Sequence, residues 1–327
     1  MQQNNGKQYH IGSNRWFLKE TKGARIFDKF VLTFLKVAYM LIFISSKILH
    51  LLLNRKGNDS IYKRISFAGF LYKSIEYLKL DNSLLIVFNV PKYDYKFFSR
   101  VTRKMENFLI TDMYISMSAH EEDILENFSP MTGDTVIDVG AAFGFYTIIS
   151  SKRVGLDGKV IAIEAQPDIY EMLNKNIKLN QFTNILSLNY AVYSQETTIK
   201  LFLPNDEENM TIYNSIMTER ANNKEKFVEV NANTLDTIIQ KTGIKEDDIN
   251  WIKIDVEGAE FEVLQGSASI LSQSKDIALL VEIHNLGEGK NMYEPIVRFL
   301  NEYNFKIDFE KTYESGEKHV IFRKNMH

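Results

Sequence analysis

The stretch that most constrains the fold is residues 135–147, which read TVIDVGAAFGFYT. Residues 136–139 have the valine and isoleucine content of a short buried parallel strand. Gly140 and Gly144 then bracket a turn, and the residues from Phe145 onward have the length and apolar spacing of a helix. A strand, a glycine turn and a helix in this order are typical of a nucleotide site at the carboxyl edge of an open α/β sheet.

Two carboxylates limit the classes of ligand that this predicted site could bind. Asp138 lies just inside the end of the strand, where it would repel a phosphate and suits a cationic or hydroxyl-bearing ligand. Glu164 ends the next predicted strand, about 20 residues beyond the turn, and is placed to hold two ribose hydroxyls. Glu164 alone would also fit NAD. The turn has three residues between its glycines, however, and lacks the third glycine of dinucleotide sites, so S-adenosylmethionine is the ligand we expect.

From residue 133 onward the pattern alternates between strands and helices. We expect strands at 159–164, 185–190, 251–255 and 278–283, and helices at 168–180, 234–243, 259–266 and 293–303. Repeated strand–helix–strand units predict a mostly parallel sheet with helices on both faces. Residues 306–309 and 320–323 predict a closing hairpin with an antiparallel edge strand. Residues 198–203 and 227–230 predict an inserted hairpin or edge pair.

Six segments taken together resemble the FkbM family of S-adenosylmethionine-dependent methyltransferases. They are DVGAAFGFYT at 138–147, IEAQP at 163–167, LNYAV at 188–192, TLDTII at 234–239, WIKIDVEGAEFEVLQG at 251–266 and VEIH at 281–284. The resemblance covers residues 110–323. It implies an α/β, class I methyltransferase (Rossmann-like) fold, whose seven-stranded, mostly parallel sheet has one antiparallel strand. It also implies methyl transfer, usually to an oxygen.

The resemblance carries nine positions over to the cofactor site. Asp138, Gly140, Ala142 and Gly144 would line the methionine end of S-adenosylmethionine, Glu164 would hold its ribose, Ala165 and Pro167 would lie near the adenine, and Asn189 and Ala191 would approach the adenine ring.

The catalytic candidates lie at the ends of the strands at 251–255 and 278–283. Methyl transfer from a sulfonium is an in-line displacement, so the enzyme mainly aligns the acceptor oxygen and removes its proton. We expect His284 to accept that proton near neutral pH, although a structural role is the alternative. Asp255 would orient the acceptor hydroxyl or help to hold a divalent cation, with Glu282 as its partner. Glu260 is expected to complement a helix dipole, and Glu257 to shape the turn before that helix.

The N-terminal part differs in character from the rest. Residues 1–80 carry 14 Lys and Arg against 4 Asp and Glu, whereas the whole chain has a net charge of −3. Residues 26–53 form the longest apolar run, with Lys29, Lys36 and Lys47 on one helical stripe. This pattern indicates a helix that spans a membrane or lies in its interface; a helix buried against the protein or a sister subunit is the alternative. We divide the chain into a basic, apolar extension (1–60), a helical and stranded preface or lid (61–130) and the cofactor-binding domain (131–327).

Composition and charge limit the classes of partner that we expect. The absence of cysteine excludes disulfides and thiolate chemistry, which fits a cytoplasmic protein that is membrane-associated if residues 26–53 contact a lipid surface. The basic residues are not interleaved with aromatic ones in a nucleic-acid-binding motif, so nucleic acid is not the expected partner. The polar segment 204–226 suits a hydroxyl-rich acceptor, a sugar, glycan or related small molecule. The rival interpretations are an NAD-dependent oxidoreductase and a non-catalytic, membrane-docked binding module.

Overall fold

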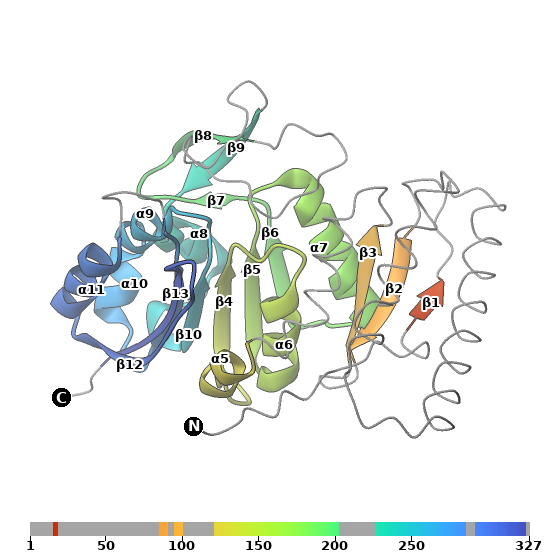
Figure 1. The fold of residues 1–327 in the computed structure, drawn as a ribbon, viewed down its shortest axis with the longest axis horizontal. Helices are drawn as coiled ribbons and strands as arrows, with labels where there is room; N and C mark the ends of the chain where they lie inside the picture. The colour runs from red at the N-terminus through yellow and green to blue at the C-terminus, as the bar shows by residue number, and fades with distance from the viewer. Residues whose placement is uncertain are drawn as a thin grey trace, which may run out of the picture. The chain divides into compact units, whose positions relative to one another are not determined.

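The structure, a computed structural model, describes residues 121–202, 227–285 and 292–324 in full. It also describes the backbone of three short strands, β1 (Trp16–Leu18), β2 (Leu85–Val90) and β3 (Tyr95–Arg100), in which β2 pairs antiparallel with both neighbours. The chain divides into two compact units, Met1–His120 and Glu121–His327. Figure 1 labels the helices and strands of the second unit. The second unit begins with the short helix α5 (Glu122–Asn127) and contains the predicted site.

A seven-stranded sheet, as counted in the described residues, forms the centre of the second unit. Its order is β12-β13-β11-β10-β4-β5-β6, and β13 is the one strand that runs antiparallel to its neighbours. The strands are β4 (Thr135–Val139), β5 (Lys159–Ile163), β6 (Ile185–Leu188), β10 (Trp251–Ile254), β11 (Ala278–Ile283), β12 (Phe305–Thr312) and β13 (Lys318–Lys324). The predicted α/β fold with one antiparallel strand is confirmed.

The position of the antiparallel strand corrects one prediction. β13 does not lie at the edge of the sheet, because it inserts between β11 and β12, and β12 forms the edge. Burial explains this order: residues 319–322 of β13 are all buried, whereas most of β12 is exposed or half-buried. A strand that is buried on both faces is stable only inside a sheet.

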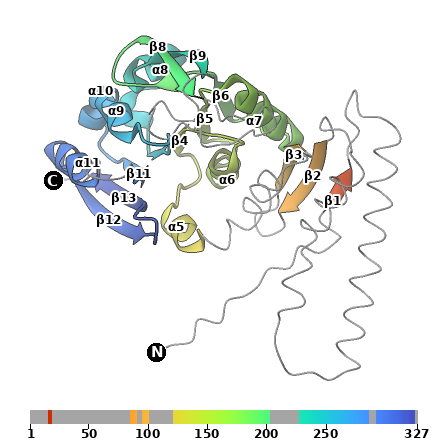
Figure 2. The ribbon, with the colours of Figure 1, turned by 45° about the horizontal axis from the view of Figure 1, so that its top comes forward.

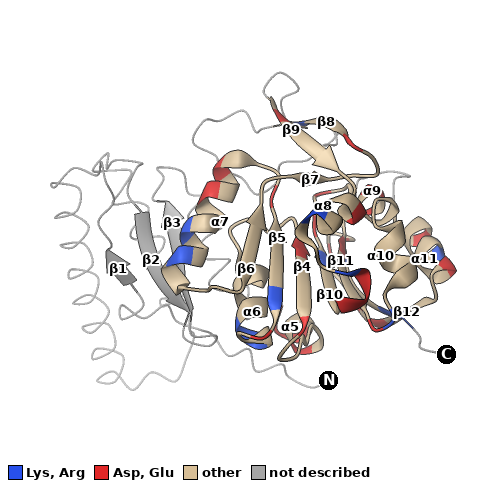
Figure 3. Cartoon of the chain, turned by 180° about the vertical axis from the view of Figure 1, so that it is seen from behind, with Lys and Arg blue, Asp and Glu red and all other residues tan. Residues whose placement is uncertain are grey.

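Helices cover both faces of the sheet. One face packs on α8 (Leu235–Thr242), α9 (Glu260–Gln265), α10 (Ala268–Gln273) and α11 (Tyr293–Glu302) through a core that contains Ile137, Ile252 and Leu279. The other face packs on α6 (Phe145–Val154) and α7 (Pro167–Asn180), and Figure 2 shows these two helices apart from the first group. α7 carries acidic residues toward its N-terminus and basic ones toward its C-terminus (Figure 3), which complements the helix dipole.

A second, three-stranded sheet of the same unit contains β7 (Ala191–Val192), β8 (Thr197–Phe202) and β9 (Phe227–Asn233). The antiparallel pairing of β8 with β9 matches the predicted hairpin. β9 is longer than expected and also pairs in parallel with β7, so these strands form a sheet of their own. The polar segment expected over the site, residues 204–226, lies outside the described residues.

No helix among the described residues is long and apolar enough to cross a membrane. Residues 26–53, for which membrane contact is predicted, lie outside the described part of the chain.

Candidate active site

The glycine turn after β4 is held between two neighbouring strands. The amides of Gly140 and Ala141 both donate to the carbonyl of Ile163 at 3.0 Å, which ties the turn to the end of β5. On the other side, a Cβ on Gly140 would lie 1.8 Å from the carbonyl oxygen of Asp255. Gly140 has φ +75° and Gly144 has φ +95°, a conformation that side chains disfavour. Glycine is therefore required at position 140 by both conformation and space.

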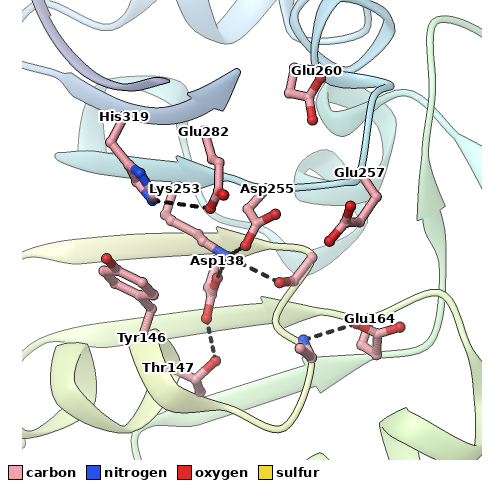
Figure 4. A network of polar contacts seen from close by, with 12 residues as sticks. Asp138, Tyr146, Thr147, Glu164, Lys253, Asp255, Glu257, Glu260, Glu282 and His319 are labelled. Carbon is pink, nitrogen blue, oxygen red and sulfur yellow. Dashed lines mark hydrogen bonds and ion pairs between the residues drawn. The ribbon is translucent and has the colours of Figure 1, made fainter. Parts of the chain in front are cut away.

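Glu164 closes this turn from the end of β5. Its Oε2 accepts from the amide of Ala142 at 2.9 Å (Figure 4). Its Oε1 accepts from the amide of Gln166 at 2.8 Å. Burial raises the pKa of Glu164 to about 7, although the two amide donors act in the opposite direction. The structure thus brings together Gly140, Ala142 and Glu164, three of the predicted cofactor residues.

The remaining residues predicted near the adenine also gather at this edge. Asn189 donates from Nδ2 to the carbonyls of Glu164 at 2.8 Å and Ala165 at 2.9 Å, so it fixes the segment after β5. Ala165 packs against the apolar cluster that contains Ala191. Pro167 begins α7, where its missing amide hydrogen leaves no helical bond unmade.

A buried lysine joins the glycine turn to the predicted catalytic residues. Lys253 pairs in register with Asp138 on the neighbouring strand, and its Nζ lies 3.6 Å from Asp138 Oδ1. Nζ also donates to the carbonyl of Gly140 at 3.1 Å and to Asp255 Oδ2 at 3.0 Å (Figure 4). Burial would lower the pKa of Lys253, but Asp255 and Asp138 outweigh it and raise this pKa. Lys253 is therefore a charged link between two carboxylates.

Asp138 itself is buried beneath α6. Its Oδ2 accepts from the hydroxyl of Thr147 at 2.6 Å, whereas its Oδ1 has no hydrogen-bond partner among the described residues. Burial raises the pKa of Asp138, and Lys253 opposes that shift. Asp138 is therefore buried, and Lys253 links its carboxylate to the carbonyl of Gly140 in the turn.

His284 lies at the centre of a group of four carboxylates. Its Nδ1 lies 2.6 Å from Glu260 Oε1, and its Nε2 lies 3.4 Å from Glu257, 3.7 Å from Glu282 and 3.9 Å from Asp255. Burial would lower the pKa of His284, but the bond to Glu260 and the surrounding charges raise it to about 10. This raised pKa argues against a free imidazole near neutral pH, and the expected role of His284 as the proton acceptor stays a prediction.

Glu282 has a partner that the sequence did not indicate. It faces His319 across the β11–β13 register, and Glu282 Oε2 lies 3.0 Å from His319 Nε2. Glu282 was predicted to pair with Asp255 around a cation, but the structure engages one of its oxygens with His319. Burial would lower the pKa of His319, and Glu282 outweighs it and raises this pKa.

Three contributors were missed or misjudged from sequence. Lys253 carried a signal, because a lysine inside the apolar strand sequence WIKI is unusual unless it is paired. His319 carried none, since its pairing depends on where β13 inserts. Glu260 was assigned to the helix dipole, but its carboxylate is buried and contacts His284 and the amide of Gly258 at 2.8 Å.

The sequence of the chain matches known methyltransferases. The family model described as methyltransferase FkbM domain matches residues 138–307. Methyltransferase sdnD of Sordaria araneosa is 28% identical over 156 residues, 40% of this chain and 59% of that protein. The hexuronic acid methyltransferase AglP of Haloferax volcanii is 28% identical over 194 residues, 58% of this chain and 71% of that protein. The structure of FkbM from Methylobacillus flagellatus KT superposes with a TM-score of 0.42 at 13% identity, covering 67% of this chain and 54% of that one. Because the family match spans more than half of its length, the chain belongs to the FkbM methyltransferase family.

Proposed function

We propose that this chain transfers a methyl group from S-adenosylmethionine to an oxygen of a sugar, a glycan or a related hydroxyl-bearing molecule. The observation that carries the proposal is the double contact of Lys253, which bonds to Gly140 of the glycine turn and to Asp255 of the carboxylate group. The turn expected to hold the methyl donor and the residues expected to receive the acceptor are thereby adjacent. Adjacent binding of two reactants is the main requirement of a bimolecular displacement.

The donor would lie over the turn between β4 and α6. Gly140 and Gly144 give the turn its left-handed conformation, and Ala142 adds only a methyl group to it. Glu164 would accept from the ribose hydroxyls. The two hydrogen bonds that Glu164 accepts from backbone amides do not prevent this, because a carboxylate offers about four acceptor positions. Asn189 would hold the segment that borders the adenine.

The reaction would be a single displacement. A lone pair of the acceptor oxygen attacks the methyl carbon, the carbon–sulfur bond breaks, and its electron pair returns to sulfur, leaving S-adenosylhomocysteine. The hydroxyl proton passes to Asp255 or Glu257, whose carboxylates lie beside His284 Nε2. Glu282, held by His319, would position this group from the neighbouring strand.

The acceptor class rests on two indications. A relative that shares 28% identity over 58% of this chain is described as a hexuronic acid methyltransferase. The segment 204–226 is rich in Asn, Asp and Glu, a composition that suits hydrogen bonding to a polyhydroxylated acceptor.

The test is methyl transfer by the full chain. Purified protein is incubated with methyl-labelled S-adenosylmethionine and, separately, with free sugars and uronic acids, soluble glycans and lipid-linked glycans. We expect label in one of the carbohydrate fractions. We also expect a loss of at least about tenfold in turnover in His284→Ala and Asp255→Ala, while both variants still bind the cofactor. Label that appears only in protein would reject the carbohydrate acceptor, and unchanged turnover in both variants would reject the catalytic assignment.

We also propose that residues 26–53 contact a membrane, on the basis of their sequence. The basic stripe and the wide apolar face would place this segment in a lipid interface or across a bilayer. Cell fractionation of the full chain and of a variant without residues 1–56 tests the proposal. The full chain should sediment with membranes and the shortened chain should not; equal sedimentation of both would refute it.

A further inference from the structure

We propose that Asp255, Glu257 and His284 form a binding site for a divalent transition-metal ion beside the carboxyl ends of β10 and β11. The role of the ion in methyl transfer rests on the proposed function, whereas its binding does not.

The three side chains offer a compact set of ligand atoms. One oxygen of each carboxylate and one ring nitrogen all lie within 4.8 Å of one another. His284 Nε2 lies 3.4 Å from Glu257 Oε2 and 3.9 Å from Asp255 Oδ1. Ligands about 2.1 Å from one ion and at right angles are about 3.0 Å apart, so small inward rotations would bring these atoms to bonding distance.

The orientation of His284 is a second, independent indication. The residue is 4% exposed, and its Nδ1 is fixed on Glu260 Oε1 at 2.6 Å. Glu260, 1% exposed, is itself fixed by the amide of Gly258. Within the described residues Nε2 makes no hydrogen bond and is directed at the carboxylates of Asp255 and Glu257. A histidine held by a carboxylate through one nitrogen, with the other directed into a group of anionic ligands, is the arrangement that metal ligands adopt.

The local charge also favours a cation. Four carboxylates lie within 4 Å of the ring nitrogens of His284: those of Asp255, Glu257, Glu260 and Glu282. Of these four, Asp255 is also contacted by Lys253 and Glu282 by His319. A bound divalent ion would offset the mutual repulsion of the carboxylates.

The donor set indicates the kind of ion. One imidazole and two carboxylates, without a thiolate, suit Mn²⁺, Fe²⁺ or Zn²⁺, whereas Mg²⁺ and Ca²⁺ prefer oxygen ligands alone. When bound, such an ion would lower the pKa of an acceptor hydroxyl that it contacts. Asp255 would keep that hydroxyl near the donor, because its carbonyl oxygen packs against Gly140.

Direct binding of Mn²⁺ to the full chain tests the site. The metal-stripped protein is titrated with Mn²⁺ and the free ion is followed by electron paramagnetic resonance, with and without excess Mg²⁺. We expect one tightly bound Mn²⁺ that Mg²⁺ displaces poorly. His284→Ala and Glu257→Gln should each weaken binding by at least about tenfold, and Glu260→Gln by about tenfold, because it orients His284 without touching the ion.

Asp247→Asn is the matched control, since it removes a carboxylate from an exposed pair with Lys275. This variant should bind Mn²⁺ as the wild type does, and circular dichroism shows which variants are folded. No saturable binding by the wild type, or equal affinity in Glu257→Gln and Asp247→Asn, would overturn the site. Site-specific Mn²⁺ binding without any methyl transfer would instead count against the proposed function and leave the site standing.

Discussion

At Gly140 the glycine turn after β4 packs against the carbonyl group of Asp255, which directly follows β10. An alanine there would bring its Cβ to 1.8 Å from the carbonyl oxygen of Asp255, at a backbone φ of +75°. Because the obstacle is main chain, the strand or the turn must move. We predict that Gly140→Ala lowers the free energy of unfolding by about 3 kcal/mol or more, measured by chemical denaturation.

Gly243 provides the matched control for this substitution. It has nearly the same φ, +77°, and a Cβ there would meet nothing within 4 Å. Gly243→Ala should therefore lower the free energy of unfolding by only about 1–2 kcal/mol, the effect of the left-handed conformation alone. Equal losses in the two variants would show that the contact with Asp255 is not the constraint.

Lys253 compensates the charges of two carboxylates, the buried one of Asp138 and the half-buried one of Asp255. Asp138 is 1% exposed and Asp255 28% exposed, and both lie within 4 Å of its Nζ. Lys253→Met would leave them uncompensated and should lower the free energy of unfolding by about 3–5 kcal/mol. Lys275→Met removes an exposed ion pair and should lower it by less than about 1 kcal/mol in the same denaturation experiment. Adding Asp138→Asn to Lys253→Met should restore part of the loss; no restoration would contradict the pairing.

Glu164 makes both stability and cofactor binding depend on pH. Burial raises its pKa from 4.5 to about 7, with Asp138 acting in the same direction and Lys253 against it. The folded chain then holds this proton more tightly than the unfolded chain, so the contribution of Glu164 to stability is lost as the pH rises from about 4.5 to about 7.

The same ionisation should strengthen cofactor binding, because the ionised carboxylate is the better acceptor for ribose hydroxyls. Calorimetry should show the affinity for S-adenosylmethionine rising about tenfold between about pH 6 and about pH 8. In Glu164→Gln the affinity should be lower and nearly independent of pH. A slope that persists in this variant would assign the pH dependence to another group.

Among the elements, α8 and α10 are both capped by side chains of the segment Thr-Leu-Asp at residues 234–236. Thr234 caps α8 by accepting from the amide of Thr237 at 3.1 Å. Asp236 instead caps α10, since its two carboxylate oxygens accept from the amides of Ser269 at 2.8 Å and Ile270 at 3.0 Å. We predict that Asp236→Ala lowers the free energy of unfolding by about 1–2 kcal/mol, and Asp236→Asn by less because it keeps one acceptor. Equal losses in urea denaturation would argue against the cap.

Elements with a strong local pattern were predictable from sequence. β4, β10 and β11 are mainly apolar runs with a carboxylate or histidine within or directly after the last residues, and the structure places them side by side as the alternating pattern requires. β7 was missed because two residues carry no period. The place of β13 was missed because insertion between β11 and β12 depends on pairing with distant segments, which local sequence does not encode.

At the scale of the molecule, the site follows from sheet topology. The order β10-β4-β5 places the glycine turn after β4 between the ends of β5 and β10, which both run parallel to β4. The chain passes from β4 to β5 on one side, and it reaches β10 on the other side only much later in the sequence. Ligands of open α/β sheets bind where the order reverses in this way. This part of the site could be predicted from residues 138–164 alone.

The catalytic half of the site could be predicted only in part. Asp255 ends one predicted strand, His284 follows another, and the two residues do lie close together. Lys253, Glu260 and His319 complete the group through contacts across strands and helices, and such contacts become visible only once the sheet order is known. Site residues at the carboxyl ends of parallel strands can thus be predicted from sequence more easily than the side chains that form ion pairs with them.

The central claim is that the turn from Gly140 to Gly144, closed by Glu164, holds S-adenosylmethionine. The most direct test is calorimetric titration of the full chain with S-adenosylmethionine and, separately, with NAD, at about pH 8, where Glu164 is ionised. We predict binding of one S-adenosylmethionine per chain, no measurable binding of NAD, and at least about tenfold weaker binding of S-adenosylmethionine by Glu164→Ala. Binding of NAD in place of S-adenosylmethionine, or unchanged affinity in Glu164→Ala, would contradict this account.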